Sequence, residues 1–112
     1  MLAVPELSTG LVIAGAFADK LRRVLFAALS DKLPRDEIVR AASELNQLLY
    51  RVIVEELGLG KGDAVRIRVH YAVENGRVRW LTDTLRIEAW RRVPDEEVAE
   101  AVRRVLGGGG GE

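Results

Sequence analysis

Residues 65–80 read VRIRVHYAVENGRVRW, and this stretch predicts a β-hairpin. Apolar residues fill every second position from Val65 to Val73, with arginines and a histidine between most of them, which is the period of a half-buried strand. The dipeptide Asn75-Gly76 then supplies the two positive φ angles that a type I′ turn requires. A two-residue turn sets three facing pairs: Val73 with Val78, Tyr71 with Trp80, and Arg68 with Asp83. The predicted hairpin therefore has one apolar and one basic face.

The apolar positions change phase beyond Asp83, where Leu85, Ile87 and Ala89 follow at odd numbers. A period of two changes phase only at a bulge, a bend or the start of a new strand. We therefore expect a bend near Asp83, followed by a third strand or by a sharply coiled continuation of the second.

Two helical patterns precede the hairpin. In the first, over residues 8–30, apolar residues recur at three- and four-residue spacing, and Ser8 or Thr9 can cap its start. Pro34 opens the second helix, and Gly58 is placed to end it. The apolar stripe of the second helix consists of Ile38, Ala41, Ala42, Leu45, Leu48, Leu49, Val52 and Ile53.

A short amphipathic helix after Pro94 completes the order of elements. The expected fold class is α+β, with two long antiparallel helices packed on a small antiparallel β-sheet and a short C-terminal helix. In this interpretation residues 7–106 form a single domain, and residues 107–112 form a flexible Gly-rich tail.

The composition excludes several kinds of functional site. The 112-residue chain has no Cys and a single His, which excludes disulfides, thiolate nucleophiles and metal sites built on cysteines or several imidazoles. The segment 58–62, GLGKG, lies between a helix and a strand and has no Ser or Thr after Lys61, so it is not a P-loop. His70 has no obvious partner for a catalytic triad. We therefore expect no enzyme, no catalytic residue, no metal, no cofactor and no small-molecule substrate.

The sequence also bears on compartment and source. No apolar run approaches the roughly 20 residues that cross a bilayer. Segment 11–18 ends in AFA, which formally matches a signal-peptidase site, but no Lys or Arg precedes it. We therefore expect a cytoplasmic protein without a membrane partner. Arginine outnumbers lysine 14 to 3, and Asn, Gln and Met are scarce, which favours a thermophilic source.

The formal net charge of zero conceals an uneven distribution. Residues 61–92 carry eight basic and four acidic groups, a net charge of +4, and residues 7–33 carry +2. Residues 34–60 and 93–112 carry −2 and −3. One interpretation is that each face is solvated, or that the basic sheet meets acidic helices of a partner subunit. The other is a basic groove that follows a phosphate backbone.

Aromatic residues stand beside arginines at two places. Arg22, Arg23 and Phe26 lie with Asp19 on the polar face of the first predicted helix, where Phe26 either stacks on nucleobases or packs under another helix or subunit. Trp90 falls on the polar side of its segment, which favours a stacking or interface surface.

The positions of two further aromatic residues in the apolar pattern bear on whether these residues are buried. Trp80 shares the phase of Tyr71, which favours a place in the core. Tyr50 borders the apolar stripe of the second helix, and both a core and a surface position fit it.

The segment 8–27, STGLVIAGAFADKLRRVLFA, resembles the opening of an archaeal family related to ThermoDBP, a single-stranded DNA-binding protein of hyperthermophiles. Further matching stretches lie at 45–50, 61–68 and 80–87, and the similarity spans residues 7–98. The resemblance implies a homo-oligomer, expected to be a tetramer, that holds single-stranded DNA in clefts between subunits. It also implies an apolar cleft flanked by basic residues, at the positions Lys20, Arg22, Arg23, Phe26, Arg66, Arg68 and Arg79.

These observations lead to one functional hypothesis and two alternatives. The hypothesis is a non-enzymatic, sequence-independent single-stranded DNA-binding homo-oligomer, with phosphates held by Arg and Lys and bases against an apolar or aromatic cleft. Its candidate nucleic-acid-binding residues are Lys20, Arg22, Arg23, Phe26, Arg66, Arg68, Arg79 and Trp90. The alternatives are a structural or adaptor homo-oligomer with weak or no nucleic-acid binding, and an RNA-binding protein.

Overall fold

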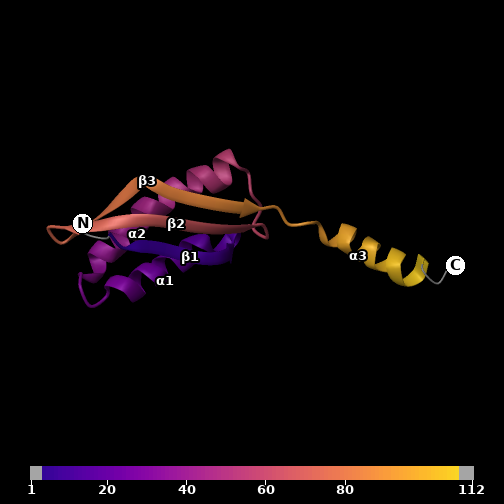
Figure 1. Ribbon diagram of the computed structural model, residues 1–112, viewed down its shortest axis with the longest axis horizontal. Coiled ribbons are helices and arrows are strands. Elements are labelled where there is room, and N and C mark those ends of the chain that lie inside the picture. The colour runs from indigo at the N-terminus through magenta and orange to yellow at the C-terminus, as the bar shows by residue number, and fades with distance from the viewer. Residues whose placement is uncertain (1–3, 109–112) are drawn as a thin grey trace.

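The computed structural model describes residues 4–108 and contains a three-stranded antiparallel sheet (Figure 1). Its strands are β1 (Glu6–Ile13), β2 (Ala64–Glu74) and β3 (Arg77–Trp90), and β2 is the central strand. The predicted hairpin is β2–β3, and its pairs Val73–Val78 and Tyr71–Trp80 are confirmed. Together with the helices, the sheet confirms the expected α+β class.

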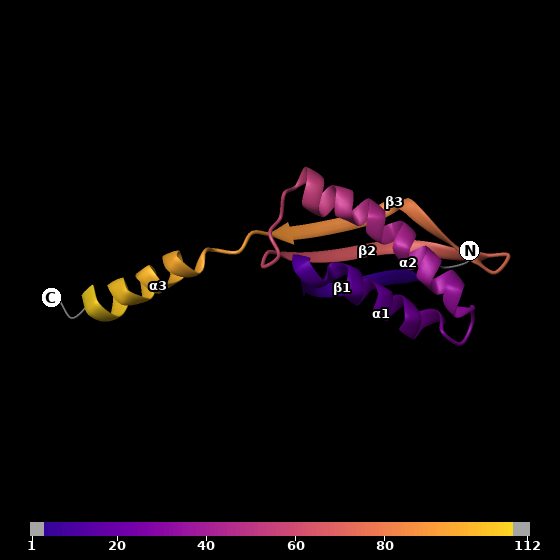
Figure 2. The ribbon, with the colours of Figure 1, turned by 180° about the vertical axis from the view of Figure 1, so that it is seen from behind.

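Two helices lie against one face of the sheet (Figure 2). The first, α1 (Phe17–Leu29), follows β1 through a 3₁₀ turn, η1 (Ala14–Ala16). The second, α2 (Arg35–Tyr50), continues as a π-helical segment, η2 (Arg51–Glu56), and Gly58 follows it with a φ of +64°. That left-handed conformation suits glycine, as the sequence predicted for the end of this helix.

A third helix, α3 (Asp95–Arg103), projects from the end of β3 away from the rest of the chain (Figure 1). It ends in a π-helical turn, η3 (Arg104–Gly108). The predicted Gly-rich tail over 107–112 thus begins inside this turn, and residues 109–112 lie outside the described part of the chain.

The core lies between the two covering helices and the sheet. Six of the eight residues in the predicted stripe of the second helix are buried, and α1 adds Leu21 and Leu25. Trp80 is buried as well: its indole N–H donates to the Ala41 carbonyl oxygen at 2.9 Å, and its ring meets the Tyr71 ring edge-on at a centroid distance of 5.6 Å. The satisfied indole N–H explains how so large an aromatic residue belongs to the core. Tyr50, by contrast, is exposed.

The prediction of a helix over the whole of residues 8–30 was wrong, because the chain before Ala14 forms the strand β1. In β1, Leu7 and Thr9 are buried and their neighbours are exposed, which is the alternation of a strand on a core. Gly10 has a φ of +66°, a conformation outside the helical region. The helical spacing of the apolar residues holds only within α1, and the prediction placed the start of this helix too far toward the N-terminus.

The predicted facing pair of Arg68 and Asp83 was also wrong, because β3 contains a bulge where the apolar phase changes. His70 pairs with Leu81, but the next pair in the ladder joins Arg68 to Arg86. The expected bend near Asp83 is this bulge, and β3 continues beyond it as the same strand. A hairpin turn sets the register only as far as the first irregularity.

Threonine hydroxyls satisfy the backbone of β2 at both irregularities of the sheet. Opposite the bulge of β3, the Thr84 hydroxyl accepts a hydrogen bond from the His70 N–H at 2.9 Å. On the other side, where the register of β1 shifts, the Thr9 hydroxyl accepts from the Ile67 N–H at 3.1 Å. Each side chain accepts a hydrogen bond from a β2 N–H at the point where the ladder is interrupted, which satisfies that backbone donor.

Candidate nucleic-acid interface

One face of the sheet is not covered by α1 or α2 and carries most of the arginines of the sheet. The odd-numbered residues of β2 from Val65 to Tyr71 are buried beneath the helices, so its even-numbered residues point to the other side. We call this side, with the paired residues of β1 and β3, the open sheet face. It carries four of the predicted site residues and some of their neighbours: Leu11, Ile13, Arg66, Arg68, His70, Arg79, Arg86 and Trp90.

Arg68 and Arg86 lie directly opposite each other in the β2–β3 ladder, and both are exposed. Among the residues that the structure describes, neither guanidinium has a carboxylate within 4.0 Å. Like charges opposite one another destabilise a sheet, so this pair has a cost in the free protein. An anion between the two guanidinium groups would remove that repulsion. The sequence pattern assigned Arg68 to this face, whereas Arg86 was missed because the bulge brings it there.

The other two arginines of the open sheet face are paired with acids. The Arg66 Nε lies 2.6 Å from Glu88 Oε1, and its guanidinium carbon is 5.5 Å from the centroid of the Trp90 ring. Arg79 binds the Glu74 carboxylate through two nitrogens, at 2.8 and 3.2 Å. These hydrogen bonds raise the pKa of both arginines and lower the pKa of Glu88 and Glu74. Both arginines are therefore held in place and partly neutralised.

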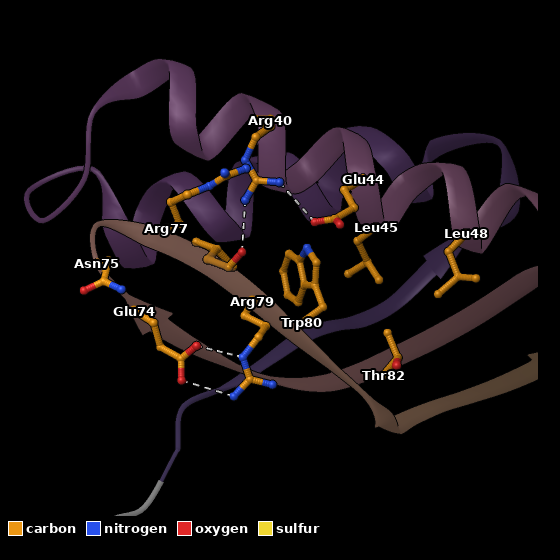
Figure 3. Close-up of a pocket in the computed structure, with 11 residues that line it drawn as sticks. Arg40, Glu44, Leu45, Leu48, Glu74, Asn75, Arg77, Arg79, Trp80 and Thr82 are labelled. Carbon is orange, nitrogen blue, oxygen red and sulfur yellow. Dashed lines mark hydrogen bonds and ion pairs between the residues drawn. The ribbon is translucent and has the colours of Figure 1, made fainter.

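A cavity of about 540 Å³ lies between α2 and the hairpin end of β3 (Figure 3), and we call it the edge cleft. Apolar and aromatic atoms of Leu45, Leu48 and Trp80 line it, together with the charged groups of Arg77 and Arg79. In Figure 3, Trp80 points toward α2, whereas Arg79 extends to the other side of the strand with Glu74. Arg79 thus belongs to both surfaces, and the edge cleft adjoins the open sheet face.

Glu37 organises the helical wall of the edge cleft. Its carboxylate accepts hydrogen bonds from Arg40 at 2.7 and 2.8 Å and from the Val78 N–H at 2.8 Å, and it lies 3.9 Å from Arg77. The hydrogen bonds from Arg40 are the main cause that lowers the pKa of Glu37 to about 2, against the effect of burial. Arg40 also donates to the Val78 carbonyl oxygen at 3.0 Å, so this pair joins α2 to β3. Glu37 lies in the first turn of α2, where an acid also interacts favourably with the helix dipole.

The predicted residues of α1 lie in the helical layer, away from the open sheet face. Asp19 pairs with both arginines of this group, at 2.6 Å to Arg22 and 3.1 Å to Arg23. Phe26 is half-buried, and the guanidinium carbon of Arg35 lies 5.2 Å from its ring centroid. The fourth member, Lys20, is half-buried as well. The eight predicted site residues therefore divide into an α1 group and an open-sheet group on different layers of one chain.

Metal-binding clusters and membrane-spanning helices are absent from residues 4–108. Within that range, no group of three or more His, Asp or Glu side chains is placed to hold a metal ion. None of the helices described there has both the length and the apolar character needed to cross a membrane.

Comparisons with known proteins agree on one family. The family model described as ThermoDBP-related, archaea, matches residues 7–79. The chain is similar to the crystal structure of apeThermo-DBP-RP2 bound to ssDNA dT10, with a sequence identity of 42% and a TM-score of 0.88. The match covers 96% of this chain and 51% of the chain in that structure. The chain thus spans about half the length of that relative. The crystal structure of pfuThermo-DBP-RP1 is 40% identical, with a TM-score of 0.77 and coverage of 92% and 69%.

No curated protein sequence matches the chain. The family model covers well over half of the chain, and both solved structures share its fold at 40% identity or more. The expected resemblance is thereby confirmed. The chain belongs to the ThermoDBP-related family of archaea.

Proposed function

We propose that this protein binds single-stranded DNA without sequence preference and acts as a homo-oligomer, with the open sheet face as its main contact surface. The observation that carries the proposal is the opposed pair Arg68 and Arg86, two exposed guanidinium groups with no carboxylate within 4.0 Å among the described residues. A relative of 42% identity was solved with a dT10 strand, which supports this class of ligand.

The Arg68–Arg86 pair holds phosphates in this proposal. Side chains directly opposite in an antiparallel pair have Cβ atoms about 5 Å apart, so both guanidinium groups reach the same stretch of backbone. Guanidinium binds phosphate through two parallel hydrogen bonds, and phosphates carry no base identity. Binding through this pair is therefore independent of sequence.

The edge cleft receives bases in the same proposal. Its apolar lining, from Leu45, Leu48 and Trp80, suits the faces of unstacked bases. Stacking on aromatic groups contributes about 1–3 kcal/mol per base and tolerates any base. Arg79 and Arg77 at the cleft bind the phosphates that flank those bases. Because Arg79 belongs to both surfaces, one strand can run from the open sheet face into the cleft.

The α1 group contributes to DNA binding in this proposal only when subunits assemble. Lys20, Arg22, Arg23 and Phe26 cannot meet the same stretch of DNA as Arg68 within one chain, because they lie on different layers. In a homo-oligomer, the α1 group of one subunit can lie beside the open sheet face of the next. All eight predicted residues then contact a strand held between subunits.

The test is a fluorescence-anisotropy titration of a labelled oligo-dT at about 50 and 200 mM salt, the range over which phosphate contacts weaken strongly. We expect Arg68→Ala/Arg86→Ala to lower the affinity at least tenfold, and the matched variant Arg22→Ala/Arg23→Ala to lower it less. Light scattering checks that both variants keep the oligomeric state of the parent protein.

Three outcomes would contradict parts of this proposal. If only Arg22→Ala/Arg23→Ala loses affinity, the open sheet face is not the main contact surface. If a matched oligo-U displaces oligo-dT at equal or lower concentration, the protein prefers RNA. An oligomer that binds neither strand would favour the adaptor alternative.

A further inference from the structure

A second cavity lies in the helical layer, on the side of the molecule away from the open sheet face. It is formed by α1 and α2, the two helices in front of the sheet in Figure 2, and has a volume of about 530 Å³. We call it the α1–α2 groove. Cavities of this size that are mostly apolar and carry a few convergent polar groups are typical of ligand sites.

The apolar part of the α1–α2 groove combines buried and exposed side chains. Phe17 and Ala42 line it and are buried in the core. Val39 and Tyr50 line it as well, but they are exposed to 41% and 51%. An exposed aromatic ring beside an apolar surface offers a stacking platform for a planar ligand such as a nucleobase.

The polar part of the groove supplies both donors and acceptors. Ser43, Asn46 and Gln47 line it on the same side of α2 as Tyr50, because residues three and four apart share a helix face. The Asn46 amide nitrogen donates to the Ala18 carbonyl oxygen at 3.2 Å, whereas its Oδ1 is buried and has no hydrogen-bond partner among the described residues. A ligand N–H would satisfy this acceptor once the amide turns toward the groove.

The charge of the groove suits an anionic group. Of its lining residues within 4–108, Arg22 alone is charged. Asp19 pairs with Arg22 at 2.6 Å, but both side chains are about half exposed, so solvent screens the pair and a phosphate can replace the carboxylate. The edge cleft, by contrast, includes the carboxylates of Glu44 and Glu74, which repel a phosphate.

We propose that the α1–α2 groove binds one nucleotide of a single strand, with its base stacked on Tyr50 and its phosphate at Arg22. The side chains of Ser43, Asn46 and Gln47 form hydrogen bonds with the edge of the base, which is free in an unpaired strand. Amides and hydroxyls both donate and accept, so the site requires a base without requiring one type. The inference rests on the proposed binding of single-stranded DNA and adds to it a base subsite in the helical layer.

The subsite gives Tyr50 and Arg22 a common ligand. The sequence left Tyr50 open between a core and a surface position, and the structure places it at the groove beside the α1 group. The Arg68–Arg86 pair contacts phosphates, which an abasic strand also carries. The α1–α2 groove therefore makes the affinity depend on the bases as well.

A helix of a partner protein fits the groove less well than a nucleotide. An apolar helix face would cover the two amides and the hydroxyl without offering them donors or acceptors, and unsatisfied buried polar groups are costly. It would also leave Arg22 without an anion in place of Asp19.

The first test locates the base on the parent protein. An oligo-dT in which iododeoxyuridine replaces thymidine is irradiated in complex with the protein, and mass spectrometry identifies the cross-linked residues. Iodouracil links to the aromatic side chains that it contacts, so we expect a cross-link at Tyr50 that an excess of unmodified oligo-dT suppresses. Cross-links at Trp90 without any at Tyr50 would overturn the inference.

The second test compares oligo-dT with an abasic strand of the same length by fluorescence anisotropy. We expect Tyr50→Ala to lower the affinity for oligo-dT about fivefold or more, because one stacked base is lost. The matched variant Tyr50→Phe keeps the ring and should stay within about twofold of the parent. The abasic strand should bind equally well to the parent and to Tyr50→Ala, because its phosphate contacts are unchanged.

The outcomes separate this inference from the proposed function. An unchanged affinity of Tyr50→Ala for oligo-dT, together with a loss in Arg68→Ala/Arg86→Ala, would overturn the base subsite alone. An equal loss for both strands in Tyr50→Ala would show that Tyr50 acts on assembly and not on a base, which also overturns it. A parent protein that binds no oligo-dT would overturn the proposed function and this inference together.

Discussion

The open sheet face and the outer side of α1 carry the same residue types, arginines beside an aromatic residue, but differ in how their charge is neutralised. On α1, Asp19 pairs with Arg22 and Arg23 at 2.6 and 3.1 Å. On the sheet, Arg68 and Arg86 face each other, and no carboxylate of the described residues lies within 4.0 Å of them. The difference shows that a count of basic residues does not locate the surface available to a polyanion.

Geometry accounts for this difference. Residues three and four apart on a helix are neighbours, so an acid one turn before two arginines meets them whatever the rest of the fold does. Across a sheet, opposite residues come from distant parts of the sequence, and the register decides which charges meet. Exposed ion pairs are worth about 0–1 kcal/mol, so DNA can still displace Asp19 from the α1 group at low cost.

The largest expected effect follows from charge reversal on the sheet. Arg68→Glu/Arg86→Glu should lower the affinity for oligo-dT by about 100-fold or more, because it removes two phosphate contacts and adds repulsion. Arg22→Glu/Arg23→Glu, measured beside it by fluorescence anisotropy, should cost about tenfold or less. Equal losses in the two variants would show that the open sheet face is not the main contact surface.

Glu37→Gln should have the next largest effect, on stability and not on binding. We expect a loss of about 2 kcal/mol at pH 7 in urea unfolding, because the carboxylate that joins Arg40 to β3 is replaced. The lowered pKa means that Glu37 stabilises the fold fully above about pH 4.5 and loses this contribution as the pH falls toward 2. The variant should lack that part of the acid transition. An affinity for oligo-dT that rises in this variant would assign Arg40 or Arg77, freed from the Glu37 carboxylate, to the binding surface.

A smaller effect, which reports on phosphate contacts specifically, is expected in the salt dependence of the affinity. Each phosphate neutralised on a single strand contributes about 0.7 to the slope of log K against log salt. Arg68→Ala/Arg86→Ala should therefore reduce that slope by about 1.4. Arg22→Ala/Arg23→Ala should reduce it by less, because Asp19 already pairs with both of these arginines. A reduced slope for the α1 variant alone would reverse the roles of the two faces.

The smallest expected effect tests the neutralising acid itself. Asp19→Asn frees Arg22 and Arg23, and we expect the affinity for oligo-dT to rise by about twofold or less, with a stability loss below about 0.5 kcal/mol. Anisotropy and thermal unfolding of the same preparation provide both values. A gain of tenfold would place the main DNA contacts on α1.

Local signals in the sequence determined the hairpin and the second helix. The alternation from Val65 to Val73 and the turn Asn75-Gly76 predict β2–β3, because period and turn chemistry act over a few residues. The stripe along α2 likewise predicts which side of the helix is buried. The assignment of Arg66 and Arg68 to one face follows from the same alternation.

Tertiary structure alone decided the rest of the fold and the composition of the site. Residues 6–13 became a strand because β2 offers them an edge, and the Thr9 hydroxyl satisfies the ladder where their register shifts. The bulge at Thr84 brought Arg86, and not Asp83, opposite Arg68. Pairing across an irregular sheet depends on contacts between segments far apart in the chain, which no local period encodes. The sequence therefore assigned Arg66 and Arg68 to one face of the hairpin, whereas the register of the sheet determined that Arg66 lies opposite Glu88 and Arg68 opposite Arg86.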